Sequence, residues 1–255
     1  MQRFDDTTVL VTGGGGGIGS ALCRRFAAER ARVAVLDRAH DAAAKVADEI
    51  DSTAGKALAV ACDITDRDAV DAAVAQVTEQ FGPIDVLVNN AVWDLFVPFL
   101  DTVPDDWARL IDINLVGALN MLHAILPRMV ERGSGRVVNI SSDAARVGSS
   151  GEAVYAACKA GLIAFSKTLA REHSRHGITL NVVCPGPTDT ALLATVTDTA
   201  ANPEKLREAF RRAIPLGRLG EPDDLTGAVL FFASSDAAYV TGQVLSVSGG
   251  LTMAG

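Results

Sequence analysis

Short apolar runs alternate with longer segments of helical periodicity along the whole chain. The runs are rich in Val, Ile and Leu, as buried strands of a parallel sheet are. This alternation predicts one α/β domain over residues 1–255, a Rossmann fold with a doubly wound, seven-stranded parallel sheet and helices on both faces. The expected strands are 7–12, 32–37, 56–63, 83–92, 136–140, 178–184 and 242–250.

The first expected strand ends in a glycine-rich loop, residues 13–19, which precedes a segment of helical periodicity. Glycines let the backbone approach a ligand closely, and the N-terminal end of a helix carries partial positive charge. The loop therefore indicates a pyrophosphate site, whereas a flexible surface turn is the alternative. The sequence lacks the Gly-Lys-Ser/Thr end of a nucleotide-triphosphate loop. The candidate contacts are Gly13, Gly16, Gly17, Ile18 and Gly19.

Acidic residues end the second and third expected strands. A carboxylate at Asp37 can accept hydrogen bonds from the adenosine ribose and repels a 2′-phosphate, which favours NAD over NADP. Arg38 complicates this preference. The alternative for Asp37 is the N-cap of a helix beginning near His40. Asp63 is expected either to bind the adenine amino group or to cap the next helix.

Tyr155 and Lys159 are four residues apart on an expected helix, which places their Cβ atoms about 5 to 6 Å apart on one face. A phenol is a poor base near neutral pH unless a nearby cation favours its phenolate. Lys159 is such a cation, and Ser142, after the strand 136–140, can bind the same oxygen. For the pair alone, a solvated helix pair is the alternative.

One long helix is expected from about Asp105 to Arg132, with Asn114 in its middle. Asparagine is disfavoured inside an apolar helical face. Asn114 therefore either satisfies a buried backbone group or holds a water for proton transfer.

The chain has 255 residues, a formal net charge of −8 and a pI near 5.0. This charge argues against nucleic acid or an anionic membrane as the main partner and favours a small molecule. Four scattered cysteines and no apolar leader lead us to expect a reducing cytoplasm. No membrane-spanning window is expected, and the sequence indicates no metal site.

Together these motifs resemble the short-chain dehydrogenase/reductase family. The segment TGGGGGIG resembles its cofactor loop, Asn89-Asn90-Ala91 resembles a strand end of the family, and CPGPTDT resembles the segment that holds the nicotinamide carboxamide. Asn114, Ser142, Tyr155 and Lys159 match its catalytic tetrad. Val92 is a departure, because the family usually has Gly there, and we expect it to narrow the pocket.

The resemblance implies an NAD-dependent oxidation of a secondary alcohol, with Tyr155 as the base. Ser142 would hold the carbonyl oxygen, Lys159 would bind the nicotinamide ribose and lower the Tyr155 pKa, and Asn114 would place a water. The expected NAD contacts beyond the glycine-rich loop are Asp37, Arg38, Asp63, Ile64, Asn90, Ala91, Tyr155, Lys159, Pro185, Gly186, Thr188 and Thr190.

Residues 190–215 are expected to form a mobile lid over the substrate. Within the family, the segments around Ser142, Cys184 and Gly249 resemble dehydrogenases of cyclic 2-hydroxycarboxyl-CoA thioesters in aromatic-ring degradation. That resemblance implies a pocket of Trp93, Phe96, Leu192 and Leu193. Lid cations at Lys205, Arg207, Arg211 and Arg212 would attract the CoA phosphates, with a solvated helix face as the alternative.

Three other functions remain open at this point: a 3-oxoacyl-thioester reductase, a general secondary-alcohol dehydrogenase, and a non-catalytic dinucleotide-binding subunit. A homotetramer is expected, because the family commonly forms one. Small residues at Ala157, Ala160, Gly161 and Ala164 also allow close packing against a partner helix. The alternative is that they face the chain's own sheet.

Overall fold

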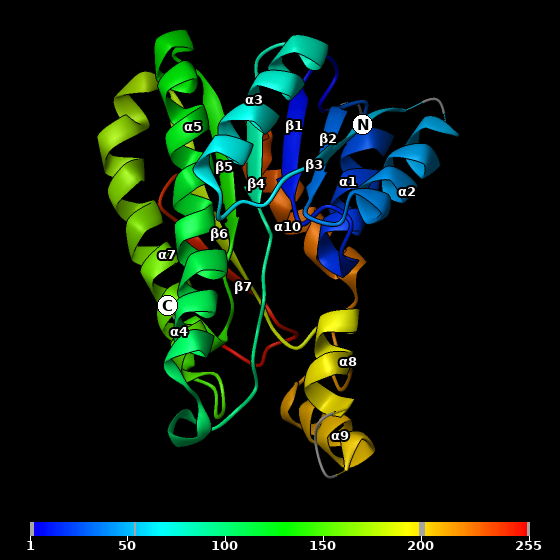
Figure 1. Cartoon of the computed structure of the whole chain (residues 1–255), viewed down its shortest axis with the longest axis vertical. Coiled ribbons are helices and arrows are strands. Elements are labelled where there is room, and N and C mark those ends of the chain that lie inside the picture. The colour runs from blue at the N-terminus through cyan, green and yellow to red at the C-terminus, as the bar shows by residue number, and fades with distance from the viewer. Residues whose placement is uncertain (1–2, 54, 199–201, 254–255) are drawn as a thin grey trace.

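The computed structural model describes residues 3–53, 55–198 and 202–253. A seven-stranded sheet in the order β3-β2-β1-β4-β5-β6-β7 forms its centre, and every neighbouring pair is parallel (Figure 1). The prediction of a doubly wound Rossmann fold is confirmed. The strands are β1 Thr8–Thr12, β2 Arg32–Asp37, β3 Lys56–Ala61, β4 Val86–Asn89, β5 Gly135–Ile140, β6 Ile178–Pro185 and β7 Val244–Val247.

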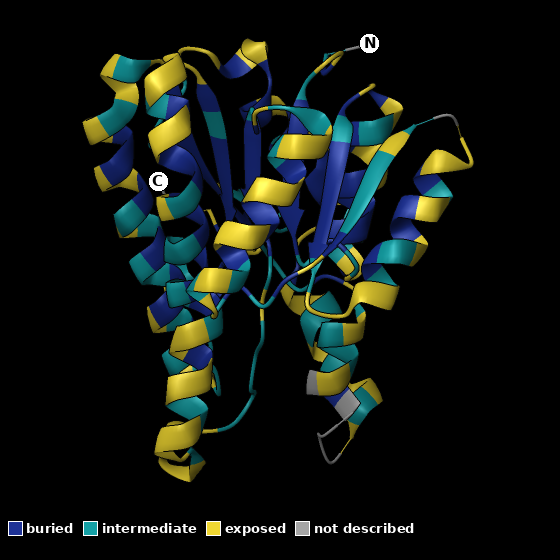
Figure 2. Ribbon diagram, turned by 45° about the horizontal axis from the view of Figure 1, so that its top comes forward, coloured by how far each residue is buried: buried dark blue, intermediate teal, exposed yellow. Residues whose placement is uncertain are grey.

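Helices cover both faces of the sheet, so each central strand buries both rows of its side chains. One core lies under α1, α2 and α10, and the other lies under α3, α5 and α7. Figure 2 shows the buried strands between helices whose outer faces are exposed. The main helices are α1 Gly17–Ala28, α2 His40–Asp51, α3 Arg67–Phe81, α4 Pro104–Ile111, α5 Gly117–Arg132, α7 Ala153–His173 and α10 Pro222–Ala233.

The strand order reverses at β1, which pairs with β2 on one side and with β4 on the other. Open α/β sheets bind ligands outside the carboxyl ends of the strands at such a point. The glycine-rich loop after β1 and the asparagines at the end of β4 therefore meet at the expected edge.

The helix expected from Asp105 to Arg132 is interrupted in the structure. A π-helical turn at Asp112–Val116 separates α4 from α5. An 18-residue window within the combined stretch Pro104–Arg132 has a mean hydropathy of 1.5, so by length and composition alone this stretch is apolar enough to cross a membrane, contrary to the expectation from the sequence. Met121, Leu122, Ile125 and Met129 are buried within the sheet-facing core, which accounts for the apolar composition.

The segment expected as a lid contains α8, Ala191–Asp198, and α9, Pro203–Ala213. Both helices lie beyond the carboxyl edge of the sheet, away from the two helical layers (Figure 1). Residues 199–201 of the expected lid lie outside the described residues. Closure over a substrate stays a prediction.

The small residues on α7 do not face the chain's own sheet. Ala157 and Ala164 are exposed, and Ala160 and Gly161 are half-buried. The alternative of packing against the sheet is therefore wrong, and the homotetramer stays a prediction.

Candidate active site

Two adjoining cavities lie along the carboxyl edge of the sheet. The first, about 370 Å³, has Ser142, Tyr155 and Lys159 in its wall, and we call it the Tyr155 cavity. The second, about 330 Å³, is lined by the glycine-rich loop and Asp37, and we call it the Asp37 cavity. The residues common to both are Ile18, Asn90, Val92, Thr190 and Leu192.

The glycine-rich loop is packed too closely for other side chains. A Cβ atom on Gly19 would lie only 2.1 Å from the Gly13 carbonyl oxygen, and one on Gly17 would lie 2.8 Å from Thr190 Cγ2. Gly13 also has a φ of +64°, which favours glycine. The α1 N-cap, Gly16, provides no side-chain cap, so backbone N–H groups at this helix end are available to a phosphate.

Asp37 is held at the end of β2 by two backbone donors. Gly15 N donates to Asp37 Oδ2 at 3.1 Å, and Ala39 N donates to Oδ1 at 3.0 Å. Ala39, not Asp37, is the α2 N-cap, so the capping alternative is wrong. The carboxylate and Arg38 both line the Asp37 cavity, as the sequence analysis expected of a ribose contact.

The third strand is shorter than expected and ends at Ala61, so Asp63 lies in the following turn. Its Oδ1 accepts hydrogen bonds from Thr65 N and Thr65 Oγ1, which lower the Asp63 pKa. Asp66 caps α3 through the N–H groups of Asp68 and Ala69, so the alternative in which Asp63 caps this helix is wrong. Asp63 and Ile64 line the Asp37 cavity, and their cofactor contacts stay predictions.

The asparagine pair at the end of β4 connects three strands. Asn90 Nδ2 donates to Thr12 O at 3.0 Å and to Gly13 O at 3.2 Å, and the Thr12 hydroxyl accepts from the N–H groups of Asn90 and Ala91. Asn89 Nδ2 donates to Asn139 Oδ1 at 2.8 Å on β5. These bonds fix the start of the glycine-rich loop against the neighbouring strand end.

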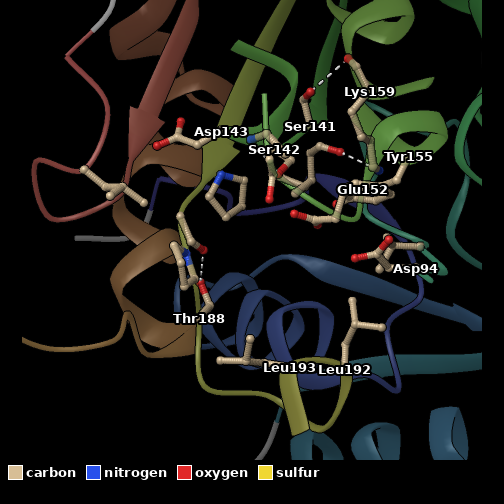
Figure 3. A pocket seen from close by; sticks show the side chains of 18 of the residues that line it. Asp94, Ser141, Ser142, Asp143, Glu152, Tyr155, Lys159, Thr188, Leu192 and Leu193 are labelled. Atoms are coloured by element: carbon tan, nitrogen blue, oxygen red, sulfur yellow. Dashed lines mark hydrogen bonds between the residues drawn. The ribbon is translucent and has the colours of Figure 1, made fainter. Parts of the chain in front are cut away.

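Three of the expected catalytic residues lie together in the Tyr155 cavity (Figure 3). The Ser142 side chain is near enough to Tyr155 to influence the pKa of its phenol. Lys159 is buried, and its ammonium donates to Ile140 O at 3.1 Å, with Nζ 5.8 Å from the centroid of the Tyr155 ring. The strand end of β5 and the first turns of α7 thus bring the serine, the phenol and the ammonium to one wall.

Burial shifts both titrating groups toward their neutral forms. It raises the pKa of Tyr155 well above its ordinary value, and the carboxylates of Asp94 and Glu152 raise it further, whereas the Ser142 side chain opposes the rise. Burial also lowers the pKa of Lys159 to about 8. Since the Lys159 ammonium points at a backbone carbonyl, its expected effect on the Tyr155 phenol stays a prediction.

Asn114 sits in the π-helical turn and satisfies backbone groups. Its Nδ2 donates to Trp93 O at 2.7 Å and to Leu110 O at 3.0 Å. The first of the two sequence-based alternatives is therefore what the structure shows. The bonds tie α4 to the segment after β4, and the expected water-holding role stays a prediction.

The substrate residues divide between the cavities. Phe96, Leu192 and Leu193 line the Tyr155 cavity as expected. Trp93 does not: it lines the Asp37 cavity, where the guanidinium of Arg109 lies 4.0 Å from the centroid of its ring. Trp93 also packs against the cluster of Leu110, Ala144 and Tyr155, so it lies near the phenol although it does not line that cavity.

Sequence reasoning did not assign the carboxyl groups of Asp94 and Glu152, which line the Tyr155 cavity beside the phenol (Figure 3). Glu152 precedes Tyr155 by three residues, a spacing that places side chains on one helical face. That spacing could have identified it. Asp94 lies in an irregular segment and gave no periodic signal.

The CPGPTDT segment leads from β6 to α8 along the cavities. Pro185, Gly186, Thr188 and Thr190 line the Tyr155 cavity, and Thr190 also borders the Asp37 cavity. Thr190 Oγ1 accepts from Leu193 N at 3.3 Å at the start of α8. The segment therefore connects the strand edge to the expected lid.

The lid arginines pair with acids of their own neighbourhood. Arg207 contacts Asp189, and Arg211 and Arg212 both contact Glu208, with N–O distances of 3.1 to 3.2 Å. Arg211 also contacts Glu204. These pairs favour the solvated-face alternative over a phosphate site for the arginines. Lys205 is exposed.

The described residues fit a nicotinamide dinucleotide. The tight glycine cradle and the uncapped start of α1 suit a pyrophosphate, and Asp37 at the end of β2 suits a ribose diol. The cavities meet at Asn90 and Thr190, so an extended molecule can reach from Asp37 to Tyr155. Among the described residues, no group of three metal-ligating side chains is placed to hold a metal ion.

Comparison with known proteins assigns the class. Residues 14–252 match the family model described as Enoyl-(Acyl carrier protein) reductase. The solved structure of levodione reductase superposes with a TM-score of 0.94 at 33% identity and covers 97% of this chain and 98% of that one. The chain belongs to the short-chain dehydrogenase/reductase family and is an oxidoreductase acting between alcohol and ketone.

Curated relatives act on several substrates. The acetoacetyl-CoA reductase of Shinella zoogloeoides is 40% identical over 94% of this chain and 96% of its own length. The 3-oxoacyl-[acyl-carrier-protein] reductase of Thermotoga maritima is 36% identical over 99% of this chain and 100% of its own. The meso-2,3-butanediol dehydrogenase of Serratia marcescens is 35% identical over 98% and 96%, respectively.

Proposed function

We propose that the protein oxidises a secondary alcohol to a ketone with NAD, using Tyr155 as the base. The carrying observation is that Ser142, Tyr155 and Lys159 lie together in the wall of the Tyr155 cavity. The Ser142 hydroxyl and the Tyr155 oxygen can hold one substrate oxygen. Tyr155, as its phenolate, takes the proton of the substrate hydroxyl, and the carbinol carbon loses a hydride. Bound NAD would supply the hydride acceptor.

The preference for NAD rests on Asp37. Its carboxylate is oriented by Gly15 and Ala39 at the end of the Asp37 cavity, where it would repel a 2′-phosphate. Arg38 lines the same cavity and would soften this preference.

For the substrate we propose a cyclic 2-hydroxycarboxyl-CoA thioester, which would be oxidised to its β-keto thioester. Segments around Ser142, Pro187 and Gly249 resemble 2-hydroxycyclohexanecarboxyl-CoA dehydrogenase of aromatic-ring degradation. Phe96, Leu192 and Leu193 give the Tyr155 cavity an apolar wall that suits a ring. Support also comes from the similarity to a reductase of a CoA thioester.

A general secondary-alcohol dehydrogenase is the second candidate. Arg207, Arg211 and Arg212 form ion pairs with acidic side chains, which favours this candidate. The acids neutralise positive charge that would otherwise attract the CoA phosphates. A 3-oxoacyl-thioester reductase shares the catalytic residues and differs only in which thioester fits.

The test is NAD-linked oxidation of 2-hydroxycyclohexanecarboxyl-CoA, its free acid and cyclohexanol, with the Tyr155→Phe variant as the control for contaminating activity. We expect the thioester to have the highest kcat/KM, since the CoA moiety adds binding energy. If cyclohexanol or the free acid is oxidised as efficiently, the thioester assignment fails and the second candidate replaces it.

A further inference from the structure

Two acidic side chains meet beside the proposed base. Asp94 follows β4 and Glu152 precedes α7, and the backbone joins their segments, because Val97 N donates to Gly151 O at 2.9 Å. Glu152 is the α7 N-cap residue, yet its side chain makes no capping bond. Its carboxyl group is therefore available to the Tyr155 cavity, which both acids line on the side of Tyr155 (Figure 3).

Asp94 lies close enough to Glu152 for the two like charges to repel each other. Asp94 Oδ1 accepts a hydrogen bond from Leu95 N at 2.7 Å, which holds the group in place. Burial first, and then the neighbouring Glu152, raise the pKa of Asp94 to about 7.

The charged residues in the wall of the Tyr155 cavity are predominantly acidic. Among the described lining residues, Asp94, Asp143 and Glu152 face a single cation, Lys159. The ammonium of Lys159 is engaged by Ile140 O, and Asp143 Oδ2 is buried with no hydrogen-bond partner in the described part of the chain. A further carboxylate entering this space would meet like charge at low effective dielectric.

We propose that Asp94 and Glu152 determine substrate specificity by excluding free hydroxy acids and admitting substrates that are uncharged beside the reacting carbinol, such as esters, thioesters and amides. The inference rests on the proposed oxidation at Tyr155. A carboxylate beside the reacting carbinol would add negative charge next to these two acids, whereas an uncharged acyl group would not.

The experiment measures binding of cyclohexanecarboxamide and cyclohexanecarboxylate to the protein saturated with NADH, by calorimetry at pH 8. The two probes share the ring and differ in charge. Asp94→Asn and Glu152→Gln keep the size of each side chain and remove one carboxyl group. Asp101→Asn, an exposed acid in the same segment after β4, is the matched control.

We expect the wild-type protein and the control to bind the amide more tightly than the acid, and each cavity variant to reduce this preference by about tenfold, equivalent to about 1.4 kcal/mol. The ratio of the two affinities is the readout, so a general loss of binding in a variant cancels. The methyl ester and free acid of 2-hydroxycyclohexanecarboxylic acid should give the same shift in kcat/KM.

An unchanged ratio in both cavity variants would overturn the inference, as would equal binding of the two probes by the wild-type protein. Failure of both probes to bind would also overturn it, since the cavity would then not take this class of ring. Loss of oxidation with the binding ratio intact would instead count against the proposed function alone.

Discussion

The Asp37 cavity and the Tyr155 cavity are neighbours built in different ways. The Asp37 cavity is lined by strand ends whose polar groups are paired with backbone, as in the bonds from Gly15 to Asp37 and from Asn90 to Thr12. The Tyr155 cavity is lined by an irregular segment at Asp94 and Phe96, by a turn before α7 and by residues of α8 and α9. The fold itself thus organises the first cavity, while connecting segments shape the second.

The electrostatics differ in the same way. Asp37 accepts two N–H donors and faces the positive end of α1, so its charge is compensated. Asp94, Glu152, Tyr155 and Lys159 are crowded in a cavity where burial shifts the pKa values of Asp94, Tyr155 and Lys159 toward the neutral forms. Such shifts are typical of reacting groups, whereas compensated charges are typical of binding groups.

Tyr155→Phe should impair catalysis in the Tyr155 cavity and leave cofactor binding in the Asp37 cavity nearly unchanged. Because it removes only the titrating oxygen, we expect turnover to fall by about 10³-fold, while NAD affinity stays nearly unchanged. Steady-state kinetics and fluorescence titration with NADH measure the two effects. Lys159→Ala, the comparison variant, should lower both. Substantial turnover in Tyr155→Phe would show that the assigned proton transfer is wrong.

Asp37→Asn should change cofactor preference in the Asp37 cavity and leave the Tyr155 cavity unaffected. The variant loses a charged acceptor for the ribose, so we expect the kcat/KM preference for NAD over NADP to fall by about ten- to a hundredfold. Asp41→Asn, an exposed acid on α2, is the control. Equal efficiency with both cofactors in the wild-type protein would show that Arg38 governs this site.

The sequence predicts the Asp37 cavity better than the Tyr155 cavity. The β-branched runs and the residues at their ends located the sheet, the glycine-rich loop and Asp37, because each of these features is local in the chain. The capping alternative for Asp63 is wrong because its carboxylate accepts hydrogen bonds from Thr65 and Asp66 caps α3. Competing caps two or three residues apart look alike in a sequence.

The Tyr155 cavity was predicted less well, because its walls depend on tertiary contacts. Helical spacing located Tyr155 and Lys159. The sequence indicated the π-helical turn only through Asn114, a polar residue in an apolar helical face. Trp93 lines the Asp37 cavity, where the guanidinium of Arg109, sixteen residues later in the chain, lies over its ring. No periodic pattern connects Asp94 with Glu152.

The oligomeric state tests whether a second copy of the chain packs against α7, the helix that carries Tyr155. Ala157 and Ala164 are exposed on α7, and a partner helix packed there would leave no room for a long acidic side chain. We expect wild-type protein to scatter light as a tetramer, and Ala164→Glu to reduce the mass two- to fourfold. Ala75→Glu, at an exposed position of α3, is the matched control. A wild-type monomer at micromolar concentration would rule out the tetramer.

The smallest expected effect is a pH dependence of stability from Asp94. The pKa of Asp94 is about 7 in the folded protein, above that of an unfolded aspartate, so the folded state binds the extra proton in between.

Stability from this group is therefore complete below about pH 4 and is lost as the pH rises through 7, at roughly 1.4 kcal/mol per unit at most. Glu152, Tyr155 and Lys159 are the titratable groups that interact with Asp94. Urea unfolding at pH 5 and pH 8 should show wild-type protein losing about 2 kcal/mol more than Asp94→Asn over this range, with Asp101→Asn behaving as wild type. Parallel pH profiles for the wild-type protein and Asp94→Asn would mean that Asp94 titrates as an ordinary surface acid, and the contrast between compensated and crowded carboxylates would then be lost.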